Sequence, residues 1–267
     1  MKNKKANSGF DLNIKNNLVK SKLSQVTIFI IIAVLIVLIA LLIFFLWRPP
    51  STTTITENPQ FYIESCVKES AEEAIDILSR QGGDIKPELS LGFMGENLTY
   101  LCYYHGNYKS CVNQRPMLIE HLQDEISEYV EGNVSECFSS LKAELEDKGY
   151  TVSVAGMNVE TELQPERVVV NVDRKLVISR RDETRTFEKF DSQAASPLYE
   201  LAEIAMEIVN QEAEFCNFEN LGFMITYPRY DIRKDSFEGS LIYTITDLET
   251  QHSFKFAVRT CVMPAGL

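Results

Sequence analysis

An uninterrupted apolar segment near the start of the chain constrains its organisation more than any other feature. Residues 26–47 read VTIFIIIAVLIVLIALLIFFLW, twenty-two residues without a charge, a proline or a glycine. As a helix rising about 1.5 Å per residue, this segment is about 33 Å long, enough to cross a hydrocarbon core of about 30 Å. We therefore predict an N-terminal transmembrane helix over residues 26–47, which contacts the lipid bilayer.

The charges on either side of the apolar segment predict its orientation. Residues 1–25 hold six lysines and one acid, Asp11, which gives a net charge of +5. Basic residues beside a span stay on the cytoplasmic side of the membrane. The prediction is a single-pass protein of the cell membrane, with residues 1–25 as a basic cytoplasmic tail and the C-terminal part outside. Residues 48–57 (RPPSTTTITE) form a Pro/Thr linker, and residues 58–267 form an extracytoplasmic domain with a subdivision near residue 149.

Other interpretations of the segment fit less well. A soluble helix would carry a polar face, and a cleaved secretory signal has a shorter apolar region of about 7–15 residues. Residues 22–46, beginning KLSQVT, resemble the signal segments of archaeal type IV pilin-like proteins. That resemblance implies cleavage between Ser24 and Gln25. However, Phe29 stands where those proteins usually carry a glutamate, and Pro49-Pro50 would end a helix that in pilins continues.

All six cysteines lie beyond the apolar segment, which predicts disulfide bonds in an oxidising compartment. No two cysteines are closer than nine positions, whereas zinc sites use close pairs. In CYYHGNYKSC, a two-residue Gly106-Asn107 turn would place Cys102 opposite Cys111, at a Cα separation of about 4.5 Å that permits a disulfide. The other four cysteines allow three pairings. Two apolar helix stripes that face each other favour Cys66–Cys137 and leave Cys216–Cys261.

The apolar spacing predicts an α+β fold in which helices pack on antiparallel sheet. One helix begins at Asn58-Pro59 and ends at Gly82-Gly83. A second covers 116–146, with Gly132-Asn133 kinking or dividing it, and a third begins at Ser196-Pro197. Alternating residues predict strands, two of them within 88–105, and an antiparallel meander after Gly149. The expected meander strands are 150–154, 158–163, 167–172, 175–179 and 184–190, and later strands are 222–227, 240–247 and 252–261.

No catalytic motif is visible in the sequence. The three histidines, His105, His121 and His252, are scattered, and the chain contains no H-E-x-x-H, G-x-S-x-G or phosphate-binding glycine loop. We therefore expect no enzymatic activity, no cofactor and no bound metal. The polar cluster Tyr230–Asp235 is interpreted as a salt-bridged turn.

The net charge and two N-x-S/T sequons predict which partners are excluded and where glycans could be attached. With +5 on the tail and −12 on the whole chain, residues 26–267 carry −17, which argues against nucleic acid and anionic headgroups as partners. Asn97 and Asn133 each begin an N-x-S/T sequon and are candidate glycosylation sites.

Three stretches of the chain carry a resemblance to a known group. They are QVTIFIII at the membrane, FYIESCVKESAEEAIDILSRQGG after the linker, and YDIRKDSFEGSLIYTITDLETQHSFKFAVRTCVMP at the end. Together they resemble the uncharacterised single-pass envelope proteins of small-genome archaea. The resemblance implies an archaeal membrane protein and assigns no catalytic or binding residue.

The sequence thus predicts an interaction or scaffold protein of the cell envelope with protein partners at the cell surface. A pilin-like filament subunit and an extracytoplasmic sensor or binding module are the alternatives, and the oligomeric state is left open.

Overall fold

The computed structural model describes residues 30–38 and 58–263, and contacts divide the chain into residues 1–52 and 53–267. Within the first unit, residues 30–38 form a helix whose large apolar side chains are 47–60% exposed. Among the described residues, no helix combines the length and the apolar character needed to cross a membrane. The predicted tail, the linker, the Gln25 cleavage site and the rest of the predicted span lie outside the described residues.

The second unit begins with the predicted helix, α2 (Pro59–Gln81). The Asn58 side chain accepts a hydrogen bond from the Phe61 amide at 3.2 Å, which caps the first turn. At the other end Gly82 adopts the left-handed conformation, with φ of 79°, and its N–H bonds the Leu78 carbonyl. Both ends therefore lie where local sequence signals predict them.

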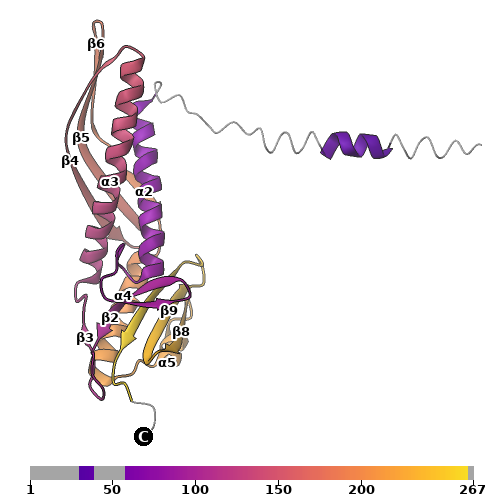
Figure 1. Cartoon of the computed structure of the whole chain (residues 1–267), viewed down its shortest axis with the longest axis vertical. Helices are drawn as coiled ribbons and strands as arrows, with labels where there is room; N and C mark the ends of the chain where they lie inside the picture. Colours follow the sequence, from indigo (N-terminus) through magenta and orange to yellow (C-terminus); the bar gives the residue numbers. More distant parts are fainter. Residues whose placement is uncertain (1–29, 39–57, 264–267) are drawn as a thin grey trace, which may run out of the picture. The chain divides into compact units, whose positions relative to one another are not determined.

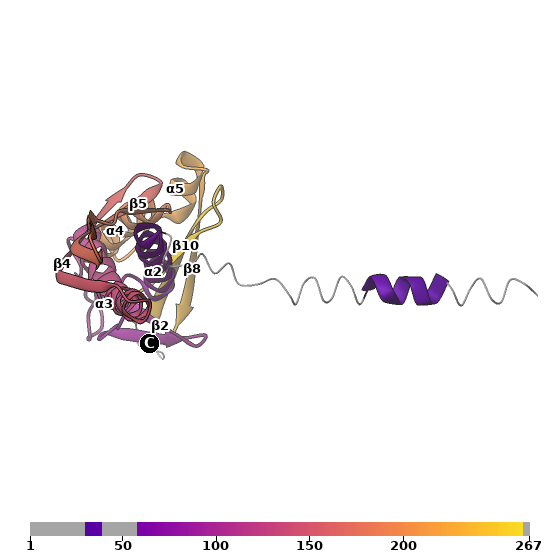
Figure 2. The same cartoon turned by 90° about the horizontal axis from the view of Figure 1, so that it is seen from above.

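A second long helix, α3 (Leu118–Asp147), lies antiparallel to α2 (Figures 1 and 2). It runs without interruption through Gly132, so the predicted division of this helix is wrong. A Cβ added at Gly132 would have no heavy atom within 4 Å beyond the neighbouring residues and the helix's own backbone, so packing does not require a glycine at this position. The apolar stripes of the two helices face each other and form much of the core. The buried members on α3 are Leu118, Leu122, Ile126, Val130, Val134, Phe138, Leu141 and Leu145.

An antiparallel four-stranded sheet packs along this helix pair. It has the order β4-β5-β6, and β7 also pairs with β5. The strands are β4 (Thr151–Gln164), β5 (Arg167–Arg180), β6 (Glu183–Lys189) and β7 (Ser192–Ala195). The first four predicted meander strands merge into two long ones. Irregularities between Val154 and Met157, and between Asp173 and Leu176, absorb the interruptions of the alternating pattern without ending a strand.

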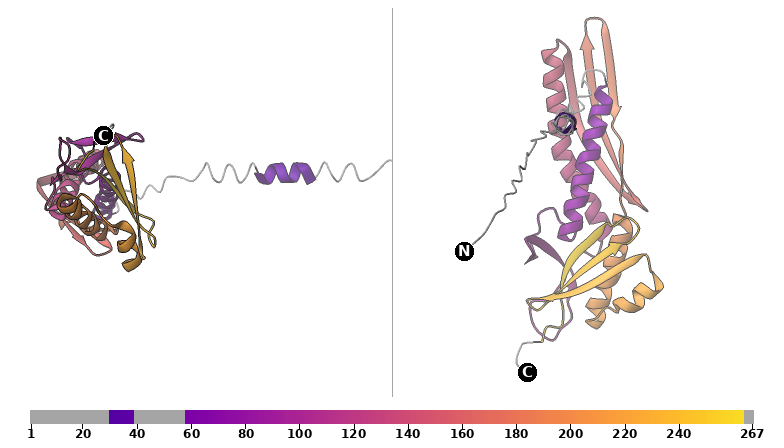
Figure 3. Two further views of the ribbon diagram at one scale, coloured as in Figure 1. Left: turned by 90° about the horizontal axis from the view of Figure 1, so that it is seen from below. Right: turned by 90° about the vertical axis from the view of Figure 1, so that its right-hand side faces the viewer.

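The second sheet has six strands, in the order β1-β2-β10-β9-β8, and β3 also pairs with β2. Its strands are β1 (Ser90–Phe93), β2 (Glu96–Tyr103), β3 (Val112–Asn113), β8 (Tyr230–Phe237), β9 (Ser240–Asp247) and β10 (Ser253–Arg259). Strand β10 pairs in parallel with β2, so this sheet is mixed rather than antiparallel as predicted. Figure 3 shows this sheet at the end of the domain opposite the first turn of α2.

Two segments before β9 differ from the prediction. Residues 222–227 were expected as a strand but lie in helix α5 (Asn220–Thr226), whose first turn is capped by the Glu219 side chain. A short apolar run has no period that separates strand from helix. The polar cluster Tyr230–Asp235 is not a turn but part of the edge strand β8, with Ile232 buried. Helix α4 (Leu198–Phe215) precedes these segments and begins next to the predicted Ser196-Pro197 start. Its buried apolar stripe includes Leu198, Leu201, Ile204, Ala205 and Ile208.

The six cysteines form the three predicted disulfide pairs, and none is free. Cys66–Cys137 joins α2 to α3, and Cys216–Cys261 joins the end of α4 to the segment after β10. Cys102–Cys111 closes the loop between β2 and β3.

The predicted hairpin register around Cys102–Cys111 is wrong, although the disulfide forms. Cys102 lies opposite Asn113, and residues 104–111 form a loop instead of a two-residue turn. The reason is a competing partner for the backbone. Tyr104 N–H bonds the Arg259 carbonyl, Tyr108 N–H bonds Val262, and Lys109 C=O accepts from Cys261. The C-terminal segment thus takes the hydrogen bonds that a tight turn would use.

Candidate functional site

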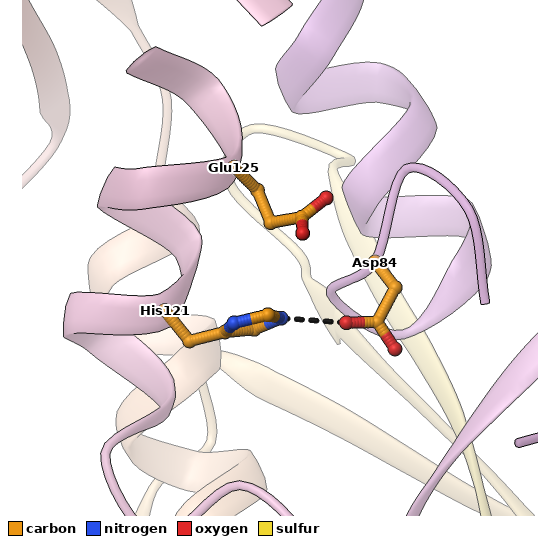
Figure 4. Close-up of side chains that lie close together, drawn as sticks. All are labelled: Asp84, His121 and Glu125. Atoms are coloured by element: carbon orange, nitrogen blue, oxygen red, sulfur yellow. Dashed lines mark hydrogen bonds and ion pairs between the residues drawn. The ribbon is translucent and has the colours of Figure 1, made fainter. Parts of the chain in front are cut away.

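Three side chains with metal-binding or acid–base chemistry gather where α2 ends and α3 begins (Figure 4). Asp84 lies in the loop after α2 and is only 4% exposed. His121 and Glu125 lie one turn apart on α3, a spacing that places both on one helix face. One donor atom from each residue lies within 4.8 Å of the others.

The two glycines that end α2 bring Asp84 to α3. A Cβ on Gly82 would lie 3.0 Å from both the Lys255 carbonyl oxygen and the Phe256 Cβ of β10. Gly83 has a φ of 100°, and a Cβ there would lie 3.3 Å from the Leu118 side chain. The chain can therefore turn tightly between β10 and α3 only because both positions lack a side chain.

Every oxygen of the Asp84 carboxylate is engaged. The Thr99 hydroxyl donates to Oδ2 at 2.9 Å, and Arg115 Nη2 donates to Oδ1 and Oδ2 at 3.2 and 3.3 Å. His121 Nε2 lies 2.5 Å from Oδ1. Burial alone would raise the pKa of Asp84, but the hydrogen bonds from His121 and Thr99 and the Arg115 charge outweigh it and lower this pKa. Asp84 is therefore a buried anion at neutral pH.

Glu125 is oriented by the backbone of the same loop. Its Oε2 accepts a hydrogen bond of 2.8 Å from the Ile85 amide, which uses one of the two carboxylate oxygens. Glu125 also lines a pocket of about 420 Å³ between the loop and α3. The pocket is lined by Ile85, Lys86, Glu125, Glu128, Tyr129, Gly132 and Asn133. The cluster thus borders a cavity large enough for a small ligand.

In the sequence, His121 is one of three scattered histidines, and the absence of a metal-binding motif predicts no bound metal. The structure places His121 against Asp84, which lies 37 residues earlier. His105 and His252 lie in exposed loops away from this cluster. The spacing of His121 and Glu125 was a readable signal for two of the three residues, whereas nothing in the sequence singled out Asp84.

The candidate glycosylation residues lie in different surroundings. Asn97 is exposed on β2, next to the turn that joins it to β1. Asn133 is partly buried on α3 and lines the pocket beside Glu125.

A second buried carboxylate, Glu212 on α4, ties that helix to the six-stranded sheet. Its Oε1 accepts hydrogen bonds from the Tyr243 hydroxyl, from Lys234 Nζ at 3.0 Å and from the Phe218 amide at 3.2 Å. Burial and the contact with Glu212 raise the pKa of Tyr243, so its hydroxyl stays protonated and donates. The Glu212 side chain is fully buried, and we interpret this cluster as structural.

Searches against protein-family models and against curated proteins find no match to this chain.

Proposed function

We propose that this protein is a membrane-anchored, extracytoplasmic interaction or scaffold protein of the cell envelope. Residues 26–47 would anchor it in the cell membrane as a single-pass helix, with residues 1–25 in the cytoplasm and the disulfide-bonded domain outside. The resemblance to envelope proteins of small-genome archaea supports this cellular location. Its partners would be other proteins at the cell surface.

The pairing of all six cysteines carries the proposal. Each disulfide braces a different part of the second unit, and none of the cysteines is free. Disulfides persist in oxidising compartments and are rare where cellular thiols stay reduced. An exported domain is the location in which this set of bonds would be maintained.

An exposed apolar helix supports an interaction role. No residue of α5 is buried, and its Leu221 and Ile225 side chains are 64% and 83% exposed. These two residues share one face of α5, while Met224 packs inward and accepts from the Ile232 amide. Exposed apolar patches of this kind mark contact sites for other proteins. Figure 1 shows α5 at the opposite end of the domain from the first turn of α2.

Labelling of the full chain in intact cells tests the topology. A single cysteine introduced at Thr53 should react with a membrane-impermeant maleimide, whereas one at Asn7 should react only after lysis. Because all six native cysteines are paired, the unaltered chain gives the background. Labelling at position 7 alone would invert the proposed topology.

Photo-crosslinking in cells tests the interaction role. A crosslinker at Thr226, beside the exposed α5 face, should give a discrete protein adduct. The pair Leu221→Ser and Ile225→Ser should abolish this adduct, whereas Met94→Ser should not, although Met94 is 85% exposed. An adduct that survives the α5 substitutions, or no adduct at all, would contradict an interaction through this face.

A further inference from the structure

We propose that Asp84, His121 and Glu125 form a binding site for a divalent transition-metal ion of the Zn²⁺ type. The proposal is independent of the scaffold role, because it rests on the side chains at the junction of α2 and α3. It assigns a ligand class to three side chains for which the sequence analysis expected no bound metal.

The geometry supplies three ligands from two rigid segments. His121 and Glu125 are held one turn apart by α3, and Asp84 is fixed from the other side by the Gly82-Gly83 turn. Their donor atoms lie within 4.8 Å of one another, and Figure 4 shows both carboxylates converging on the space in front of the His121 ring. Two ligands of a tetrahedral zinc ion lie about 3.4 Å apart, given metal–ligand distances of about 2.0–2.2 Å. Small side-chain rotations would therefore bring the three atoms to a common centre.

The contacts of His121 Nε2 give an independent reason. This nitrogen lies 2.5 Å from the acceptor Oδ1 of Asp84, and at the same time 3.3 Å from the donor Nε of Arg115. If Nε2 carries a proton, its N–H points at the Arg115 N–H, and two donors cannot form a hydrogen bond. If Nε2 is unprotonated, its lone pair points at the Asp84 carboxylate oxygen, and two acceptors repel each other. No protonation state of His121 satisfies both neighbours.

A metal ion removes this conflict. Bound to Nε2, it would attract the Asp84 carboxylate, and Arg115 would keep its bond to Asp84 Oδ2 while leaving Nε2. Arg115 can make this movement because its side chain is 35% exposed. The Glu125 bond to the Ile85 amide uses Oε2 and leaves the other oxygen for the metal.

The ligand types select the class of ion. Imidazole nitrogen suits Zn²⁺ and its neighbours in the first transition series, whereas Ca²⁺ and Mg²⁺ take oxygen ligands almost exclusively. Three protein ligands leave a fourth tetrahedral position for water, as in zinc sites that react with or bind further ligands. The pocket bordered by Glu125 offers space for such a ligand.

The test uses the full chain purified in detergent, freed of metal with a chelator and titrated with Zn²⁺ and with Co²⁺. We expect one equivalent of either ion to bind, a rise in melting temperature with Zn²⁺, and a Co²⁺ visible spectrum of four-coordinate character. Ca²⁺ should not change the melting temperature. An equal response to Ca²⁺ would indicate general binding to an acidic surface and would overturn the proposal.

Variants locate the ion. His121→Ala should weaken Zn²⁺ binding by at least about 100-fold, because loss of a ligand costs more than the 10- to 100-fold loss seen for its outer partners. Glu125→Gln should also weaken binding, whereas Asp124→Asn, on the same turn of α3, should not. Arg115→Ala should strengthen it, since the competing cation is removed.

The Arg115 variant separates this proposal from a purely structural ion-pair network, in which Zn²⁺ would not bind any form. Melting curves without metal show whether each variant folds. If His121→Ala does not fold, the Zn²⁺ affinity of Glu125→Gln still decides the test. Absence of stoichiometric Zn²⁺ binding to the unaltered chain would refute the proposal, as would binding that the His121 and Glu125 variants leave unchanged.

Discussion

Removal of the Cys66–Cys137 disulfide should destabilise the domain more than removal of Cys102–Cys111. The first bond joins cysteines 71 residues apart and links the two long helices, whereas the second closes a loop of nine. On the chain-entropy model these separations correspond to about 4.4 and about 2.6 kcal/mol. The shorter loop lies inside the longer one, but shortening the longer loop by nine residues changes its contribution by only about 0.1 kcal/mol.

The two bonds also differ in burial, which makes the ranking a demanding test. Cys66 and Cys137 are partly buried on helix faces, whereas Cys102 and Cys111 are buried in the core. Alanine at the buried pair loses more packing than alanine at the partly buried pair, and the difference is about 1 kcal/mol. Loop entropy and packing therefore act in opposite directions on the ranking, and the entropy difference of about 1.8 kcal/mol should prevail.

The assay is the melting temperature of the full chain in detergent, followed by circular dichroism. A domain of this size shifts by about 2–4 °C per kcal/mol, so Cys66→Ala with Cys137→Ala should lower the midpoint by about 9–18 °C. Cys102→Ala with Cys111→Ala should lower it by less. Under reducing conditions the unaltered chain should melt at a lower temperature, because the stabilisation from each disulfide is lost. A larger loss from the Cys102–Cys111 pair would show that packing, rather than loop closure, controls these contributions.

Three further substitutions test individual contacts by thermal or denaturant melts. Gly82→Ala should destabilise the domain more than Gly149→Ala, because both glycines have positive φ but only the Cβ added at position 82 would lie 3.0 Å from β10. Tyr243→Phe removes a donor from the buried Glu212 and should cost about 1–3 kcal/mol. Burial alone would raise the pKa of Asp247, but hydrogen bonds from Arg229 and nearby amides lower it, so its contribution is present above the unfolded pKa and is lost as pH falls through the folded one. Asp247→Asn should therefore be less stable at neutral pH and lose less stability in acid, and equal pH profiles would contradict this account.

Local signals predicted those features whose causes are local. Asn58-Pro59 and Gly82 determine the ends of α2 through a side-chain cap and a left-handed residue, and both signals are visible in a short window of sequence. The α3 stripe was equally readable, except that a single Gly132 does not outweigh the packing on either side of it.

Features that depend on distant partners were not readable. Gly106-Asn107 is a good turn sequence, yet the loop bonds the segment after β10, about 150 residues later. The same limit applies to the candidate site. His121 and Glu125 could be paired by their spacing, but Asp84 reaches them only because the Gly82-Gly83 turn fits against β10. Neither of these two long-range contacts produces a periodic pattern of residues that could be read from the sequence.

Strand β10 (Ser253–Arg259) contributes to both of these features, the loop after β2 and the turn that positions Asp84. It lies against the Gly82 turn that positions Asp84, pairs in parallel with β2, and leads to Cys261, which is bonded to Cys216 directly after α4. The candidate site, the loop closed by Cys102–Cys111 and the attachment of α4 therefore all require the last strand. Such contacts join residues far apart in sequence, and their closure entropy is paid before any stabilisation is gained. Since Cys216–Cys261 fixes the segment directly after β10, this disulfide holds in place the strand on which the geometry of the Asp84 site depends.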